Sequence, residues 1–419
     1  MTRERMLEKL YNLKGTGLDL RKVLMRMSNP QEKFRSIRVG GTNGKGSTCV
    51  FLAQILRESG YRIGLFTSPH LSDPEERIEI NGEKISREGF QIFFERSWHV
   101  IREIYGPQAE SKARFFEVLV AMALDYFAEH RVEIAIIEAG VGGRRDDTNV
   151  VCPILSILTS VDLDHCEVLG NTLQEIAHEK AGLAPPGITL LTAEEKPEAL
   201  GVIEAVCRTQ RSELIHVDFS RLRVKRSDWD GQCFDWGSLE NLETRVLGRY
   251  QLRNAAMALT AIELLNKKSF AVSEHAIREG LRKACWPGRM ELLHKRPYVL
   301  LDGAKNPAGL RSLKNSLCGL EYENLILVLG IATRKDIFQM VQEIIPGAAH
   351  AIITQAPFRG SEPELLAAEV QRITDAYEIV PTPALALERA LTLAQSDDLV
   401  CVTGSLFLMG EVRSLWHNP

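Results

Sequence analysis

Short apolar runs and helical apolar patterns alternate along the first half of the chain. A β-branched run at residues 36–39 leads into a glycine-rich turn, and a helical pattern from Val50 to Leu56 leaves it. Residues 132–138 and 154–159 form two further apolar runs, which are typical of strands buried on both faces of a parallel sheet. This alternation predicts an α/β fold with a doubly wound sheet, in which ligands lie beyond the carboxyl ends of the strands.

The segments between these runs predict further elements. We expect a helical preamble up to about residue 35, a small hairpin with its turn at Asn81-Gly82, and a long helix at 115–129. Residues 205–247 are polar and follow no regular pattern, which favours an irregular segment. An alanine-rich helix then begins at Arg249.

The alternation of strands and helices starts again near Arg296-Pro297. The runs typical of strands are 298–301, 325–329, 351–354 and 399–403. We therefore expect two domains. Residues 1–296 would form a doubly wound domain with a phosphate-binding loop (P-loop), and residues 297–419 would form a smaller Rossmann-like α/β domain.

The composition limits the classes of partner. The chain has 419 residues, a formal net charge of −4 and 25% charged residues, which argues against a protein that wraps nucleic acid. Its start is amphipathic and carries acidic residues, and no segment has the length and purity of a membrane span. The eight cysteines are scattered, without a Cys-x-x-Cys pair. We expect a cytoplasmic monomer with reduced thiols, and neither a membrane nor a nucleic-acid partner.

The glycine-rich turn carries the first candidate chemistry. In Gly41-Thr-Asn-Gly-Lys-Gly-Ser47, backbone N–H groups at a helix N-terminus would converge on a phosphate, and the lysine would add a point charge. The usual expression for such loops is not met, because Val39 replaces its first glycine and Gly46 follows the lysine directly. This variant spelling is the form found in Mur-type amide ligases. The candidates for nucleotide binding are Asn43, Gly44, Lys45, Gly46 and Ser47.

Lys180 lies on the apolar stripe of a predicted helix. Thr172 and Glu175 have capping-box spacing, and the i, i+3, i+4, i+7 pattern that follows places Lys180 on the inward face. A buried ammonium group is unfavourable unless it is paired or chemically changed. Either Lys180 reaches solvent or a carboxylate such as Glu175 or Glu179, or its neutral amine reacts with carbon dioxide. The resulting carbamate would be an oxygen donor for a metal.

Glu138 and His165 each follow a predicted strand. An ionised carboxylate at the end of an apolar strand either binds a hard cation such as Mg²⁺, or it caps a helix or pairs with Arg144 or Arg145. Imidazole is not a typical Mg²⁺ ligand. From its own position, His165 is therefore better explained by hydrogen bonding.

Several separate blocks of sequence occur in a defined order. They are Gly41-Thr-Asn-Gly-Lys-Gly-Ser47, Thr67-Ser-Pro-His-Leu71, Phe115-Phe-Glu117, Glu138-Ala-Gly-Val-Gly-Gly-Arg-Arg-Asp-Asp-Thr-Asn149, Asp164-His165, Glu179-Lys-Ala-Gly182, Pro287-Gly-Arg289, Asp302-Gly-Ala-Lys-Asn-Pro307 and Val402-Thr-Gly-Ser-Leu406. With these blocks the sequence resembles the folylpolyglutamate synthase/dihydrofolate synthase family of Mur-type ligases, over nearly its whole length.

The resemblance implies an ATP-dependent ligase that adds L-glutamate to dihydropteroate, to a reduced folate or to both. ATP would phosphorylate the acceptor carboxylate, and the amine of glutamate would attack the acyl phosphate. The resemblance also implies two Mg²⁺ ions. Their ligands would be Ser68, Glu138, His165 and a carbamylated Lys180.

The resemblance assigns further residues by position. The catalytic set would be Lys45, Glu138, His165 and Lys180. The nucleotide would also contact Asn254, Arg289, Asp302 and Lys305. The pterin-bearing acceptor would contact Arg114, Phe115, Phe116, Glu117, Arg145, Asp146 and Asp147.

Two positions depart from the family pattern. Lys305 stands where histidine is usual, so positive charge is kept while the acceptor nitrogen and the titration of imidazole are lost. Arg114 stands where a small hydroxyl residue is common, and its guanidinium would either clash with the acceptor or grip a carboxylate. Two rival hypotheses remain. One is another Mur-type ligase, against which the Thr67-Ser-Pro-His70 and Asp302-Gly-Ala-Lys-Asn-Pro307 blocks argue. The other, suggested by the two departures, is a nucleotide-binding regulatory protein with a decayed active site.

Overall fold

The computed structural model describes residues 2–417, and the chain divides into two compact units. The first unit contains the chain up to Asp218 together with Asn254–Gly280, and the second contains Phe219–Arg253 and the chain from Leu281 onward. Each unit is therefore built from two separate segments of sequence. The expected boundary near residue 296 falls inside the second unit, and it remains a prediction about which parts fold independently.

A mixed sheet organises the first unit, in the order β4-β3-β2-β5-β1-β6-β7-β8 within the described residues. The pairs β2–β3 and β3–β4 are antiparallel, and the strands from β2 to β8 otherwise pair in parallel. Because β5 and β6 lie on either side of β1, the loop after β1 lies at a switch point of the topology, where such sheets bind ligands. The strands are β1 (Arg35–Gly40), β2 (Ile63–Phe66), β3 (Ile78–Ile80), β4 (Glu83–Lys84), β5 (Ile134–Glu138), β6 (Pro153–Leu158), β7 (Leu190–Thr192) and β8 (Leu214–His216).

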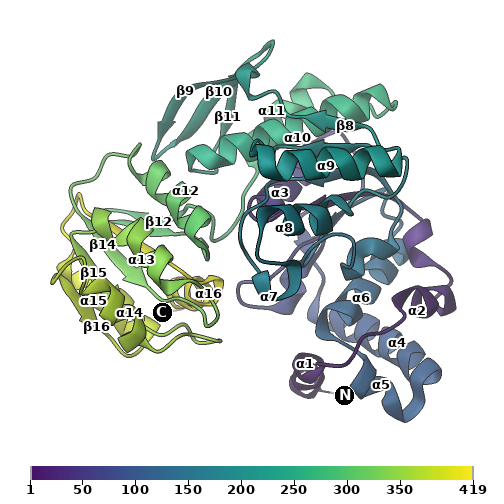
Figure 1. Cartoon of the computed structure of the whole chain (residues 1–419), viewed down its shortest axis with the longest axis horizontal. Helices are drawn as coiled ribbons and strands as arrows, with labels where there is room; N and C mark the ends of the chain where they lie inside the picture. Colours follow the sequence, from purple (N-terminus) through teal and green to yellow (C-terminus); the bar gives the residue numbers. More distant parts are fainter. Residues whose placement is uncertain (1, 418–419) are drawn as a thin grey trace. The chain divides into compact units, whose positions relative to one another are not determined.

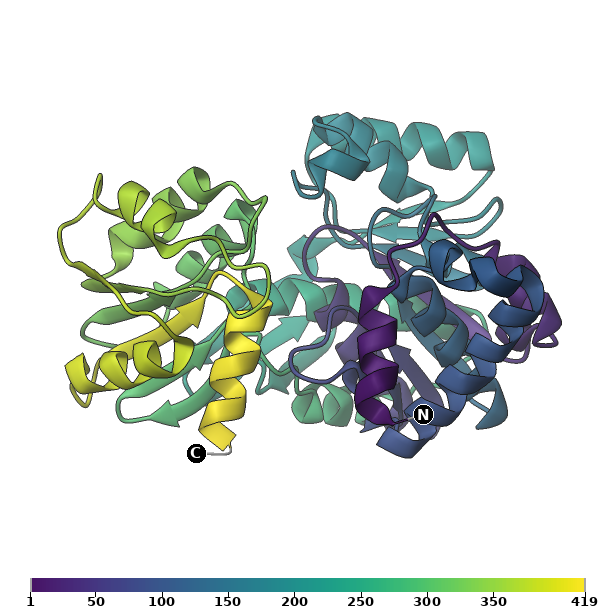
Figure 2. The ribbon, with the colours of Figure 1, turned by 90° about the horizontal axis from the view of Figure 1, so that it is seen from below.

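Helices cover both faces of this sheet. Ala135 and Ile137 of β5 share a hydrophobic core with α4 and α6, whereas α3 contacts β1, β2 and β5 from the opposite face. Figure 2 shows the purple helix α1 beside the blue helices α4 and α6, which it contacts. The helices are α1 (Arg3–Asn12), α2 (Leu20–Arg26), α3 (Lys45–Glu58), α4 (Arg87–Tyr105), α5 (Ala109–Lys112), α6 (Phe115–Glu129), α7 (Cys166–Leu169), α8 (Leu173–Ala181), α9 (Pro197–Gln210), α10 (Arg249–Lys267) and α11 (Glu274–Lys283).

The prediction of an irregular segment at 205–247 is wrong. The end of α9 and strand β8 occupy its start, and β9 (Leu222–Asp228), β10 (Gly231–Trp236) and β11 (Leu239–Thr244) follow as an antiparallel sheet in the second unit (Figure 1). Most side chains of β9 are exposed or half-buried. A strand with polar residues on both faces lacks the apolar alternation by which strands are recognised.

A second, largely parallel sheet organises the rest of the second unit, in the order β12-β13-β17-β14-β15-β16. Four of its strands were predicted: β13 (Tyr298–Leu301), β14 (Leu325–Leu329), β15 (His350–Ile353) and β17 (Leu399–Thr403). The short β12 (Glu291–Lys295) and β16 (Tyr377–Ile379) lie at its edges and were not predicted. The helices are α12 (Pro307–Leu317), α13 (Ile337–Ile344), α14 (Pro363–Val370), α15 (Pro383–Leu393) and α16 (Leu406–His417).

The doubly wound fold with a second α/β sheet is therefore confirmed. The bounds of α6 and the hairpin at Asn81-Gly82 also match their predictions. The eight cysteines are all free thiols. None of the helices in the described part of the chain is long and apolar enough to cross a membrane.

Candidate functional site

The loop after β1 has the geometry of a phosphate cradle. Helix α3 begins at Lys45, and its N-cap Gly44 has φ +84° and offers no side-chain cap. Gly41 has φ +139°, and a Cβ there would lie 1.9 Å from Thr159 Oγ1. Glycine is required at both positions, and the N-cap supplies no side-chain acceptor to the N–H groups of the first turn of α3.

The loop after β6 holds this cradle in place. Thr159 Oγ1 donates to the carbonyl of Asn43 at 2.6 Å. Thr42 Oγ1 donates to the carbonyl of Asp162 at 3.2 Å and accepts from its N–H at 3.0 Å. Since β1 and β6 are neighbours in the sheet, the loops that follow them meet at its carboxyl edge.

Two lysine side chains converge on one carbonyl of the cradle. Lys45 Nζ donates to the carbonyl oxygens of Gly41, at 3.1 Å, and of Thr42, at 3.3 Å. Lys180 Nζ donates to the same Gly41 oxygen at 2.8 Å. The burial predicted for Lys180 is confirmed, because the residue is 4% exposed. This convergence concentrates positive charge at the N-terminus of α3.

The contact of Lys180 with Gly41 was not among the contacts considered from the sequence. Of the two carboxylates considered there, Glu175 completes the capping box of α8 with Thr172. Glu179 accepts from the N–H of Arg145 at 2.8 Å. Both carboxylates therefore take part in hydrogen bonds that stabilise α8 and the loop beside it.

Asn254 also lies at the cradle. A Cβ on Gly44 would be 2.5 Å from Asn254 Oδ1, so the amide group lies against the turn that starts α3. Next to it, Thr48 Oγ1 donates to Met257 Sδ at 3.9 Å. Helix α10 thus brings a predicted nucleotide-binding residue to the loop from a distant part of the sequence.

Ser68 and Glu138 meet at the ends of β2 and β5. Glu138 is 3% exposed, and its Oε2 accepts from the N–H of Ser68 at 2.9 Å. A hydroxyl and a carboxylate are the hard oxygen donors that Mg²⁺ prefers, so this pair fits the expected metal. His165, in contrast, is the N-cap residue of α7 with φ +53°, and its Nδ1 lies 3.9 Å from Glu167 Oε1. Among residues 2–417, no three His, Cys, Asp or Glu side chains form a ready metal cluster.

Arg38 is a site residue that the sequence reasoning missed. It is fully buried in β1 and donates to the carbonyl of Gly143 at 2.7 Å, to Thr148 Oγ1 at 3.0 Å and to Asn149 Oδ1 at 2.8 Å. Burial lowers the pKa of its guanidinium to about 10, so it remains charged at neutral pH. An arginine inside a buried strand needs such partners, and that was the available signal. Arg38 fixes the loop that follows Glu138.

Asp146 serves the same loop. Its Oδ2 accepts from the N–H of Val141 at 2.9 Å, and its Oδ1 accepts from the N–H of Thr148 at 2.9 Å. The side chain of Arg145, by contrast, is 84% exposed. Of these two predicted acceptor-binding residues, Asp146 is therefore committed to loop structure and Arg145 is accessible.

Arg114 is held by two carboxylates of its own chain. Its Nη2 lies 2.7 Å from Glu117 Oε1 and 3.4 Å from Asp147 Oδ1. Burial, together with repulsion from Glu117, raises the pKa of Asp147 to about 7. The guanidinium that departs from the family pattern thus offsets the charge of an acidic pair, and three predicted acceptor residues form one network.

Aromatic rings extend this network. Phe115 stacks on Tyr11 with centroids 5.3 Å apart and an interplanar angle of 12°. Phe116 packs against Phe66 at 5.6 Å and against the position where a Cβ on Gly140 would stand. The two rings at the start of α6 therefore face different neighbours.

The second unit positions its predicted residues around Asp302. This carboxylate is 3% exposed. Its Oδ2 accepts from Tyr250 Oη at 2.7 Å and from the N–H of Met290 at 3.0 Å, and its Oδ1 accepts from the N–H of Ala304 at 2.9 Å. Arg289 lies next to Gly303, where a Cβ would be 2.1 Å from Arg289 Nη1. Lys305, beyond them, is half-buried.

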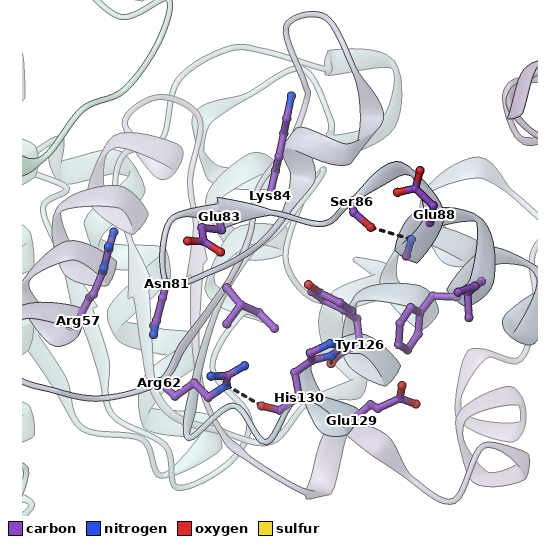
Figure 3. A pocket seen from close by; sticks show the side chains of 14 residues that line it. Arg57, Arg62, Asn81, Glu83, Lys84, Ser86, Glu88, Tyr126, Glu129 and His130 are labelled. Atoms are coloured by element: carbon purple, nitrogen blue, oxygen red, sulfur yellow. Dashed lines mark hydrogen bonds between the residues drawn. The ribbon is translucent and has the colours of Figure 1, made fainter.

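A separate surface pocket of about 760 Å³ lies near the amino end of β2, away from the loops at the carboxyl ends of the strands. Figure 3 shows Arg62, Asn81, Tyr126 and His130 among the residues that line it. Asn81 Oδ1 accepts from the N–H of Ile63, at the amino end of β2. None of the predicted site residues lines this pocket.

Fold and site together define the class of Mur-type ligases. The model of the Mur ligase middle domain matches residues 39–262, and that of the Mur ligase glutamate ligase domain matches residues 288–406. The dihydrofolate synthase/folylpolyglutamate synthase of Bacillus subtilis is 36% identical over 414 residues, which cover 95% of this chain and 94% of the relative. The chain therefore belongs to the folylpolyglutamate synthase/dihydrofolate synthase family of Mur ligases, and it is an ATP-dependent ligase.

Solved structures agree with this assignment. The crystal structure of folylpolyglutamate synthase from Thermotoga maritima is 34% identical, with a TM-score of 0.86 over 99% of this chain and 97% of that chain. The structure of E. coli FolC in complex with DHPP and ADP is 27% identical, with a TM-score of 0.87 over 99% and 97% of the two chains.

Proposed function

We propose that this ligase joins L-glutamate to dihydropteroate, to a reduced folate or to both, with ATP as the energy source. The observation that carries the proposal is the pair of lysine side chains on the Gly41 carbonyl, beside the uncapped start of α3. Anion affinity at that place suits the β- and γ-phosphates of ATP. The full-length similarity to a dihydrofolate synthase/folylpolyglutamate synthase supports the choice of acceptor.

The reaction has two steps. An oxygen of the acceptor carboxylate attacks the γ-phosphorus of ATP, the bond to the β-phosphate oxygen breaks, and ADP leaves. The amine of glutamate then attacks the carbonyl carbon of the acyl phosphate, loses a proton and expels inorganic phosphate. Lys45 and the N–H groups of α3 offset the charge that gathers on the transferred phosphoryl group.

The metal would be held by Ser68, Glu138, His165 and a modified Lys180. The hydroxyl of Ser68 and the carboxylate of Glu138 supply oxygen donors from adjacent strand ends. Mg²⁺ bound by these residues would supply positive charge that offsets the repulsion between the acceptor carboxylate and the phosphates.

Carbamylation of Lys180 is supported by its surroundings. Its amine is buried and shares the Gly41 oxygen with a second ammonium group. A carbamate keeps one N–H for that hydrogen bond and replaces a cation with an oxygen donor. Asn254, Arg289, Asp302 and Lys305 would bind the remainder of the nucleotide. Asp302 already accepts three hydrogen bonds, so little of its capacity remains for the ribose.

Lys180→Ala tests the carbamate. We expect a severe loss of ligation that a small carboxylic acid partly restores, because the acid replaces the missing oxygen donor. Ala181→Ser on the same helix is the control for the added acid, which should not change its activity. A Lys180 that stays unmodified in a high-resolution structure grown with bicarbonate would contradict the proposal.

The acceptor would lie against Phe115 and Phe116, with the Arg114–Glu117–Asp147 network beside it. The accessible Arg145 is suited to an acidic part of the acceptor. Asp146 would act through the loop that it organises.

A comparison of two acceptors tests the function directly. Purified enzyme is supplied with ATP, Mg²⁺, labelled L-glutamate and either dihydropteroate or tetrahydrofolate. We expect labelled product with at least one of them, and none when ATP is omitted. ATP turnover without glutamate incorporation on either acceptor would contradict the proposal. Turnover with a peptidoglycan precursor in their place would favour the other Mur-type reading.

A further inference from the structure

Three side chains from separate segments form a hydrogen-bonded chain beside Phe115. Arg77 Nε donates to His70 Nδ1 at 3.0 Å, and His70 Nε2 lies 3.3 Å from Tyr11 Oη. Arg77 and His70 are each 7% exposed, whereas Tyr11 is 44% exposed. The chain therefore begins in the interior and ends at a partly exposed tyrosine.

The chemistry of the groups fixes the direction of every hydrogen bond. An arginine Nε can only donate, so His70 Nδ1 must be the accepting nitrogen, and the ring carries its proton on Nε2. That proton is donated to Tyr11 Oη. The proton of the Tyr11 hydroxyl is not used in this chain of hydrogen bonds, so Tyr11 can donate it to another group.

The ring of Tyr11 places this donor at the aromatic block of the site. Tyr11 stacks on Phe115, and the guanidinium of Arg77 lies 5.2 Å from the centroid of the same ring. His70 follows the strand end at which Ser68 meets Glu138. The chain of hydrogen bonds thus connects the aromatic block with the residues after β2.

We propose that the Tyr11 hydroxyl donates a hydrogen bond to a carbonyl or carboxylate oxygen of the pteroyl acceptor. Tyr11 is then a residue that binds the acceptor, and His70 and Arg77 are positioning residues that aim its hydroxyl group. The inference rests on the proposed function, because it names a binding residue for that acceptor.

Tyr11→Phe tests the proposal, because it keeps the stacked ring and removes only the hydroxyl group. We expect the KM for the acceptor to rise about three- to tenfold, as the loss of one hydrogen bond predicts. The KM values for ATP and glutamate and the kcat should stay near those of the wild type. The measurement is steady-state ligation with each substrate varied in turn.

Tyr61→Phe is the matched control. Tyr61 also pairs with an aromatic ring, that of Phe270, and its Oη accepts a hydrogen bond from the N–H of Ala271. Tyr61 lies outside the proposed acceptor site, so loss of its hydroxyl group should not change the KM for the acceptor. Equal rises in the two variants, or no rise in Tyr11→Phe, would overturn the inference.

Variants of His70 test the aiming role. In His70→Gln the side-chain amide can still accept from Arg77 and donate to Tyr11, so the KM for the acceptor should stay close to that of the wild type. His70→Phe loses both functions and should raise that KM as Tyr11→Phe does. The double variant Tyr11→Phe/His70→Phe should then have a KM for the acceptor no higher than that of either single variant. Additive effects would overturn the positioning role.

Failure of this inference differs from failure of the proposed function. A wild-type enzyme that incorporates no glutamate refutes the function itself. An active wild type with an unchanged Tyr11→Phe variant refutes only the role of Tyr11.

Discussion

The loops after β1 and after β13 occupy similar places in their sheets but differ in how the helix that follows each of them is capped. Each follows a strand of a parallel sheet and leads to the start of a helix. At the first, the N-cap Gly44 has no side chain and leaves the helix uncapped. At the second, Asn306 Oδ1 accepts from the N–H of Gly309 at 2.8 Å, and Asp302 Oδ1 accepts from the N–H of Ala304.

The same strand–loop–helix arrangement can therefore have two different functions. An uncapped helix start keeps its N–H groups for an anion from outside the protein. A loop whose N–H groups bond to its own side chains offers other side chains instead, here Lys305 in the loop and Arg289 from an earlier segment next to Gly303. The first loop is thus suited to bind phosphate, whereas the second is suited to present cationic side chains.

The strongest test of this contrast is Lys45→Ala. We expect ligation to fall by about 1,000-fold, because the charge that offsets the transferred phosphoryl group is lost. The fold should persist, as checked by circular dichroism, and steady-state turnover gives the measurement. Lys22→Ala, at an exposed position of α2, is the control. Near-normal turnover of Lys45→Ala would show that the cradle has been assigned to the wrong loop.

Alanine substitution at one glycine of each loop should show that the first loop loses more stability than the second when a Cβ is added. Gly41→Ala combines a Cβ 1.9 Å from Thr159 Oγ1 with φ +139°, and we expect it to lower the free energy of unfolding by about 3 kcal/mol. The added Cβ of Gly303→Ala would lie 2.1 Å from Arg289 Nη1, 2.5 Å from Leu406 Cδ2 and 2.8 Å from Met409 Cε. Because these atoms are ends of side chains and not backbone atoms, about 1–2 kcal/mol is expected.

Urea denaturation of both glycine variants gives the comparison. Gly347→Ala, where nothing lies within 4 Å of the added Cβ, is the neutral control. A larger loss of stability in Gly303→Ala than in Gly41→Ala would reverse the expected order.

Lys305→His tests the role of the cationic side chain in the loop after β13. We expect kcat/KM for ATP to fall about tenfold at pH 8, because imidazole with an ordinary pKa near 6.5 is then mostly neutral. Part of the loss should be regained at pH 6, where the ring is charged, relative to the wild type at the same pH. Higher activity in the histidine variant at pH 8 would mean that Lys305 is a defect rather than an adaptation.

The smallest expected effect concerns the cap itself. Asn306→Ala removes the acceptor for Gly309, and the free energy of unfolding should fall by about 1 kcal/mol. Asn306→Asp keeps an accepting oxygen and should lose less. Equal losses in the two variants would show that α12 does not depend on this cap.

The parts of the site that follow from short-range pattern were predictable. The capping box of α8 and the inward face of Lys180 depend on neighbours within one or two helical turns, and the structure confirms both. The ends of the buried strands were recognisable because their apolar runs stop abruptly. The roles given to individual residues by resemblance remain predictions.

Other parts depend on residues that are far apart in the sequence. The sequence reasoning did not find the partners of Arg38, because they lie in other loops. The contact of Lys180 with Gly41 and the chain from Arg77 to Tyr11 also join distant segments. No local pattern encodes such pairs, since strand order decides which loops meet.

The sequence by itself determined the class of fold, the glycine-rich loop after β1 and the family, because periodicity and motif spelling are local properties. Only the tertiary structure decided that polar residues 222–244 form an antiparallel sheet. It also decided that Asn254 lies against Gly44 and that Asp302 is buried under three donors. The physical reason is that burial and hydrogen-bond partners are set by strand order and helix packing, which bring distant segments into contact.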